Sequence, residues 1–340
     1  MQAVYAMEEA RMRNVARLSL ATYVWLMLAG CSTAGDAGDA STAGEAARPA
    51  LPAGAEAISL LGEPLVAPAP GANAETLQAN LAAARAAYEN TPEDADSIIW
   101  LGRRHAYLAQ YREAIDVFTR GIALHPDDAR LYRHRGHRWI TVRELDNAIA
   151  DLTKAAELIR GTPDEIEPDG APNAYNIPTS TLQSNIWYHL ALAHYLKGDF
   201  EAALPAWLEG MAVSSNNDMK VATSDWLYMT YCRLGREAEA AAVLEPISAD
   251  LEILENTAYH RRLLMYKGEV SADSLLAVDT ADPVQLATYG YGVGNWYLYN
   301  GDAERAAAIF RRILEQPNWA AFGFIAAEAE FARETVPRLP

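Results

Sequence analysis

Arginine and histidine are concentrated in two short stretches of this sequence. One stretch carries Arg103 and Arg104, and the other, residues 130–138, carries four arginines and two histidines. A guanidinium group presents a planar fork of N–H donors that binds a carboxylate or phosphate through paired hydrogen bonds. The cluster therefore suggests a pocket for an acidic peptide, a C-terminal carboxylate or an anionic glycan. In the alternative interpretation, these arginines pair on a solvated face with nearby carboxylates, namely those of Glu113, Asp116, Asp127 and Asp128.

Patterns that would indicate catalysis or metal binding are missing from the sequence. The chain has seven histidines, but none forms a helical ligand pair with a third ligand nearby. His189 and His194 are five residues apart, a spacing that puts them on different faces of a helix. The sequence has no Gly-x-Ser-x-Gly elbow and no phosphate-binding glycine loop. We therefore expect no enzymatic activity, no cofactor and no metal site.

The element that must position the basic cluster is a repeated unit. Residues 95–128 and 129–162 are two copies of one 34-residue unit and align without a gap, with Ala114 on Ala148. A fixed period of this length is typical of stacked helix–turn–helix repeats, which bury a continuous core only by packing on their neighbours. The period therefore favours a solenoid whose extended concave face holds a partner.

The residue at the turn between the two helices of a unit allows the repeats to be counted. It falls at six positions, Ala109, Arg143, Gly198, Gly235, Gly268 and Gly301. Glycine suits such a turn because it adopts positive φ at little cost. The spacings are 34, 55, 37, 33 and 33 residues, which places an insertion of about 21 residues between the second and third units.

The small residues expected where helices cross, and the aromatic residues between units, resemble the tetratricopeptide repeat. The resemblance runs from about Ala72 to Arg333 and implies an all-α, right-handed superhelical solenoid of about six repeats. The repeat domain would span residues 73–335, starting with a lone half-repeat helix over 73–91. An amphipathic segment from Trp319 onward would form the C-terminal capping helix that solenoids need for solubility.

In tetratricopeptide proteins the first helix of each unit lines the concave groove. Carrying the groove positions of that family onto this sequence predicts seven contacts to a protein or peptide partner: Arg103, Tyr107, Arg130, Arg133, His137, Tyr188 and Tyr195. The expected groove is basic at its N-terminal end and rich in tyrosine further along.

The insertion, residues 161–183, is acidic and has neither a helical nor a strand period. It carries Asp164, Glu165, Glu167 and Asp169. Long insertions without secondary structure are usually functional or disordered. We expect this one to fold onto the basic groove as a lid or as an internal mimic of the ligand, so that deleting residues 163–178 would tighten binding of an anionic partner. Calcium binding by its acids is a weaker alternative, because their order matches no known calcium loop.

The first thirty residues have the pattern of a secretory signal, with arginines at positions 11, 13 and 17 before an apolar run over 18–28. The ending Leu28-Ala29-Gly30-Cys31 resembles the lipobox of bacterial lipoproteins. That resemblance implies lipidation of Cys31 after removal of residues 1–30. With Ser32 next, it also implies a place at the periplasmic face of the outer membrane of a Gram-negative cell. Residues 31–72, rich in Ala, Gly and Pro, are predicted to form a disordered tether.

The formal net charge of −17 argues against nucleic acid as a partner and against broad adhesion to anionic lipid. Contact with a membrane would then come from the lipid anchor alone. The expected function is that of a non-catalytic adaptor or scaffold, which binds a protein or peptide in its concave groove during envelope assembly or transport. The alternative function is a binding module for a soluble anionic ligand or a peptide carboxylate.

Overall fold

The six turn residues predicted from the sequence all adopt a left-handed backbone in the computed structural model. Their φ angles are 58° at Ala109, 66° at Arg143 and between 67° and 90° at the four glycines. Each turn follows one helix and precedes the second helix of the same unit. The count of six helix–turn–helix units is therefore confirmed.

The structure describes residues 51–69, 71–277 and 283–337, and all of them belong to one compact unit. The predicted signal peptide 1–30, the lipidation site Cys31 and the first part of the tether lie outside the described residues. No helix in the described ranges is long and apolar enough to cross a membrane.

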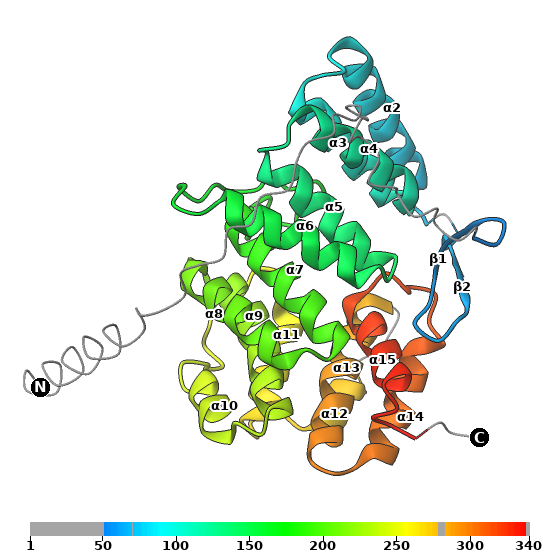
Figure 1. Cartoon of the computed structure of the whole chain (residues 1–340). Helices are drawn as coiled ribbons and strands as arrows, with labels where there is room; N and C mark the ends of the chain where they lie inside the picture. The colour runs from blue at the N-terminus through cyan, green and yellow to red at the C-terminus, as the bar shows by residue number, and fades with distance from the viewer. Residues whose placement is uncertain (1–50, 70, 278–282, 338–340) are drawn as a thin grey trace, which may run out of the picture. The chain divides into compact units, whose positions relative to one another are not determined.

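Helices make up nearly all of the regular structure, and the fold class is all-α, as expected (Figure 1). A lone helix α2 (Ala74–Asn90) precedes the six units, as the sequence predicted. The six helix pairs are α3 (Ala95–Tyr107) with α4 (Tyr111–Leu124), α5 (Ala129–Thr141) with α6 (Leu145–Leu158), α7 (Leu182–Lys197) with α8 (Phe200–Val213), α9 (Asn217–Arg233) with α10 (Glu237–Leu244), α11 (Thr257–Tyr266) with α12 (Ala272–Leu276), and α13 (Pro283–Tyr299) with α14 (Ala303–Leu314).

Glycine allows the two helices of a unit to approach closely. A β-carbon at Gly136 would lie 2.7 Å from Cγ of Leu152, and one at Gly102 would overlap the ring of Phe118. Both partner side chains are almost completely buried. The solenoid core is therefore built from small residues facing large ones, as the aligned units indicated.

A short hairpin differs from the disordered tether that composition predicted for residues 31–72. Strands β1 (Ala55–Ile58) and β2 (Pro64–Val66) pair antiparallel. The hairpin packs on the solenoid, since Ala57 is fully buried and the Nε1 of Trp319 donates a hydrogen bond to the carbonyl of Val66 at 2.6 Å. The prediction of a disordered tether is therefore wrong for this hairpin. Its conformation is fixed by two buried apolar side chains and by contacts with residues distant in sequence, although its composition is typical of disorder.

The C-terminal helix α15 (Phe322–Ala332) also differs from its prediction. A capping helix was expected to keep one polar face in water, but nine of its eleven residues are buried. The helix packs against α13 and α14, and it also reaches α7 in the third unit (Figure 1). Its two glutamates, Glu328 and Glu330, are buried in ion pairs with arginines of the preceding repeats. Helix α15 thus fills part of the inner face of the solenoid.

Candidate functional site

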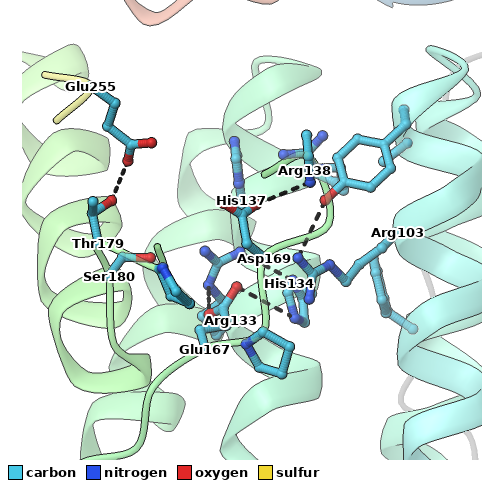
Figure 2. Close-up of a pocket in the computed structure, with 16 residues that line it drawn as sticks. Arg103, Arg133, His134, His137, Arg138, Glu167, Asp169, Thr179, Ser180 and Glu255 are labelled. Atoms are coloured by element: carbon cyan, nitrogen blue, oxygen red, sulfur yellow. Dashed lines mark hydrogen bonds and ion pairs between the residues drawn. The ribbon is translucent and has the colours of Figure 1, made fainter. Parts of the chain in front are cut away.

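The basic cluster of the sequence lines a cavity of about 260 Å³ between α3, α5 and the insertion. We call this cavity the basic pocket. Figure 2 shows its charged side chains gathered around Glu167 of the insertion. The residues that define it are Arg103, Tyr107, Arg133, His134, His137, Arg138, Glu167, Asp169 and Thr179.

Local sequence explains why these side chains share one face. Arg103 and Tyr107 are four residues apart on α3, and Arg133 and His137 are four residues apart on α5, so each pair lies on one side of its helix. Asp94 and Asp128 start the two helices by accepting hydrogen bonds from the backbone N–H groups of Ser97 and Arg130. The 34-residue period then places the two faces side by side.

The insertion folds over this pocket, as its acidic composition predicted. Glu167 lies 2.9 Å from the Nε of Arg133, and both side chains are about one-tenth exposed. Arg104 donates a hydrogen bond to the carbonyl oxygen of Gly170 at 3.1 Å. At the other end of the insertion, Thr179 donates to the carboxylate of Glu255. The insertion is therefore held both to the first two units and to the segment before α11.

Two arginines of the pocket lack a carboxylate partner. Within the part of the chain that the structure describes, no acidic group lies within 4.0 Å of the guanidinium of Arg103 or of Arg138. Arg103 donates to the hydroxyl of Tyr107 at 3.3 Å and stacks on Trp100 at 4.5 Å. Arg138 lies 5.6 Å from the ring centre of Tyr111. Three arginines and three acids (Glu167, Asp169 and Glu255) thus line the pocket, but of the arginines only Arg133 forms an ion pair with one of these acids.

Burial, followed by repulsion between positive charges, shifts the pKa values of the pocket. Burial, together with repulsion from Arg133 and Arg103, lowers the pKa of Arg138 to about 10. Burial, with repulsion from Arg133 and Arg138, holds the pKa of His134 and of His137 well below the usual value of 6.5. Both imidazoles are therefore neutral at pH 7, and the arginines supply the positive charge of the pocket.

The structure brings four of the seven predicted groove residues into the pocket: Arg103, Tyr107, Arg133 and His137. Arg130 points instead into a neighbouring cavity, where it pairs with Asp96 and Asp128 at 2.6 Å each. For Arg130 and Asp128, the alternative interpretation of local ion pairs is therefore correct.

The two tyrosines predicted for the later groove do not reach the pocket. Tyr195 is fully buried, and its hydroxyl accepts hydrogen bonds from Tyr291 and Asn295 at 2.9 Å. The Tyr188 hydroxyl lies 3.0 Å from that of Tyr259. We correct the expectation that Tyr195 faces a partner: α15 covers this part of the inner face, and Glu330 of that helix accepts from Tyr291.

Sequence reasoning missed Thr179, Ser180 and Glu255 as part of the site. They come from the end of the insertion and from the loop before α11, where no repeat pattern marks them. Trp100 was expected to fill a gap between units, yet it also stacks beneath the guanidiniums of Arg103 and Arg104. The spacing of three residues between Trp100 and Arg103 on one helix was a usable signal.

Histidines gather beside the pocket, with the rings of His137 and His189 centred 4.3 Å apart. Across the described residues, no group of three or more His, Cys, Asp or Glu side chains is placed to hold a metal ion. The chemistry offered by the site is thus the binding of an anion by guanidinium groups and a tyrosine hydroxyl.

Comparison with known proteins finds no matching family model and no matching curated protein. Solved structures with a similar fold include YrrB, described as a TPR protein with an unusual peptide-binding site, at 16% identity over 73% of this chain and 98% of that one, with a TM-score of 0.39. The Cut9–Hcn1 structure of the APC/C matches at 17% identity over 75% of this chain and 46% of that one, with a TM-score of 0.45. The P58(IPK) TPR domain matches at 16% identity over 77% and 85%, with a TM-score of 0.23. The helix–turn–helix solenoid described above rests on the six helix pairs of the chain itself.

Proposed function

We propose that this chain is a non-catalytic adaptor that binds an acidic segment of a protein partner in the basic pocket. The observation that carries the proposal is the pair of guanidiniums, Arg103 and Arg138, that line a cavity without a carboxylate partner. An anionic ligand would supply the missing charge, and a partly enclosed site strengthens such a charge-assisted bond.

The proposed ligand is part of a protein because a solenoid of stacked repeats offers an extended surface for a partner. The pocket lies at the N-terminal end of the solenoid, and Phe322 at the start of α15 reaches its edge, where the ring centres of Phe322 and His137 are 5.3 Å apart. Tyr107 and Trp100 flank the arginines with flat rings, which provide the apolar contact that peptide backbones and side chains use.

We further propose that the adaptor is held at a membrane by lipid on Cys31, at the periplasmic face of the outer membrane, and that it serves envelope assembly or transport. Support for this part comes from the residues around Leu28 and Cys31 alone. Labelling with a radioactive fatty acid, comparing wild type with Cys31→Ser, tests it: incorporation by both proteins, or by neither, would contradict lipidation at Cys31.

Fluorescence anisotropy with a labelled hexaglutamate peptide tests the binding proposal, with hexaglutamine as the control peptide. We expect the double variant Arg103→Ala/Arg138→Gln to bind about tenfold or more weakly, because hydrogen bonds to charged groups contribute about 1.5–3 kcal/mol. Raising the salt concentration should also weaken binding by the wild type.

The matched control is Arg236→Ala, which removes an exposed arginine of the fourth unit that pairs with Glu239 and lies over the ring of Tyr231. Unchanged affinity in the Arg103/Arg138 variant would contradict the proposal. Binding of citrate but of no acidic peptide would favour the alternative function, a module for a soluble anion.

A further inference from the structure

A short segment of the insertion separates two cavities. We call residues 165–169 the strap. The basic pocket lies on one side of it, and a second cavity of about 170 Å³ lies on the other. Both cavities share Arg103, His134, Glu167 and Pro168 in their walls. Without the strap, the two cavities would form one groove that runs across α3 and α5.

The strap is extended, and two backbone hydrogen bonds and one ion pair hold it. The N–H of Glu167 donates to the carbonyl of Ser180 at 3.2 Å, and the N–H of Leu182 donates to the carbonyl of Glu165 at 2.8 Å. Ile166 keeps 68% of its surface exposed, so burial of its apolar side chain does not fix the strap. The main attachment to the groove is the ion pair between Glu167 and Arg133.

The strap presents ligand-like groups to the groove. Glu167 puts one carboxylate oxygen against Arg133 and also accepts a hydrogen bond from Asn185 at 3.2 Å. Its other oxygen lies 3.9 Å from the Nε2 of His134. Asp169 adds a second acid that lines the basic pocket. A β-carbon at Gly170 would overlap the Tyr107 hydroxyl and lie 2.9 Å from a guanidinium nitrogen of Arg103.

We infer that the strap occupies the place of the ligand, and that the partner displaces it with an extended acidic segment of its own. This inference rests on the proposed function. By the chemistry of the strap, the partner segment carries an acid that replaces Glu167 at Arg133 and a second acid two residues later.

The probe for the test is the strap's own sequence as a labelled peptide, Glu-Ile-Glu-Pro-Asp-Gly, blocked at both ends. The protein is the full chain. We expect Glu167→Gln to bind this peptide at least tenfold more tightly than wild type does, because the variant loses the ion pair that holds the strap in place. The control peptide has glutamine in place of the second glutamate. It should bind the Glu167→Gln protein no more tightly than it binds the wild-type protein.

A second variant separates displacement from the change in charge. Gly170→Ala keeps Glu167 but forces the strap away from Tyr107 and Arg103, so it should also tighten peptide binding. Glu157→Gln is the matched control, since it removes an exposed acid of α6 that lines neither cavity. Circular dichroism and the melting temperature show whether each variant folds.

The outcomes are distinct. Equal affinity for wild type, Glu167→Gln and Gly170→Ala would overturn the strap inference and leave the proposed pocket intact. Failure of every variant to bind an acidic peptide, or binding that survives Arg103→Ala/Arg138→Gln, would overturn the proposed function and the inference with it.

Discussion

Arg143 and Glu328 are 185 residues apart in the chain and form a buried, two-pronged ion pair. The Nε and Nη2 atoms of Arg143 each lie 2.9 Å from a carboxylate oxygen of Glu328, and each side chain is 2% exposed. Arg143 also donates to the carbonyls of Thr141 and Trp319. One side chain thus ties the turn between α5 and α6 to the C-terminal helix.

Removing one member of this pair should destabilise the fold strongly. We expect Glu328→Ala to lower the free energy of unfolding by about 3–5 kcal/mol, because it leaves a buried guanidinium without a counter-charge. Urea denaturation followed by circular dichroism measures this. The matched control is Glu239→Ala, which breaks the exposed pair with Arg236 and should cost less than about 1 kcal/mol. Similar losses in the two variants would contradict the role assigned to the buried pair.

The turn residue Ala109 should accept glycine with a gain in stability. Its φ of 58° is a left-handed conformation, which costs a residue with a β-carbon roughly 1–2 kcal/mol. Glycine avoids this cost but destabilises the fold by about 0.5–1 kcal/mol, because it loses more conformational entropy on folding. We expect Ala109→Gly to raise the melting temperature slightly. In contrast, Ala148→Gly, inside α6, should lower it. A fall in both variants would show that the turn is not strained.

Stability should fall as the pH drops from about 7.5 to 5.5. Burial and nearby arginines hold the pKa of His134, His137 and His189 well below 6.5 in the folded chain. Below pH 6.5 these histidines therefore take up protons in the unfolded chain but not in the folded chain. As the pH falls, each histidine lowers the free energy of unfolding by up to about 1.4 kcal/mol per pH unit.

Urea denaturation across this pH window measures the slope. In His189→Gln the slope should become shallower by about one proton. A slope that is the same in wild type and His189→Gln would contradict neutral burial of His189.

Gly292 on α13 should not tolerate even a methyl group. A β-carbon there would overlap the guanidinium of Arg262, which is 1% exposed and lies 2.7 Å from the fully buried Asp225. Because Arg262 cannot move without leaving that carboxylate unpaired, we expect Gly292→Ala to cost about 3 kcal/mol or more.

The neighbouring Gly290 offers the matched control for Gly292→Ala. A β-carbon at Gly290 would lie 3.0 Å from the end of the Ile313 side chain, which can shift. Gly290→Ala should therefore cost clearly less when the two variants are compared by urea denaturation. Equal tolerance of both substitutions would contradict the tight packing of Arg262.

Local features of the sequence predicted the repeats and much of the site. The turn positions from Ala109 to Gly301 could be found because each unit repeats its own short-range pattern. The fold of the insertion over Arg133 could be expected from opposite charges. The burial of α15 could not be predicted, because Glu328 and Glu330 fit the solvent-exposed face of an amphipathic helix. Their ion-pair partners, Arg143 and Arg233, come from distant repeats and lie next to them only in the folded chain. The burial of Tyr195 could not be predicted for the same reason, since the helix that covers it, α15, is distant in sequence.

The contact of α15 with α7 changes how the molecule comes apart. In an open array of repeats each unit touches only its neighbours, so the ends can fray one repeat at a time. Here the last helix returns to the third unit, and Arg143 extends the link to the second. These contacts connect the C-terminal helix to the second and third units, so the repeats between them should not fray independently. Unfolding should therefore be more cooperative than in an open array, and pairing residues so distant in sequence should slow folding.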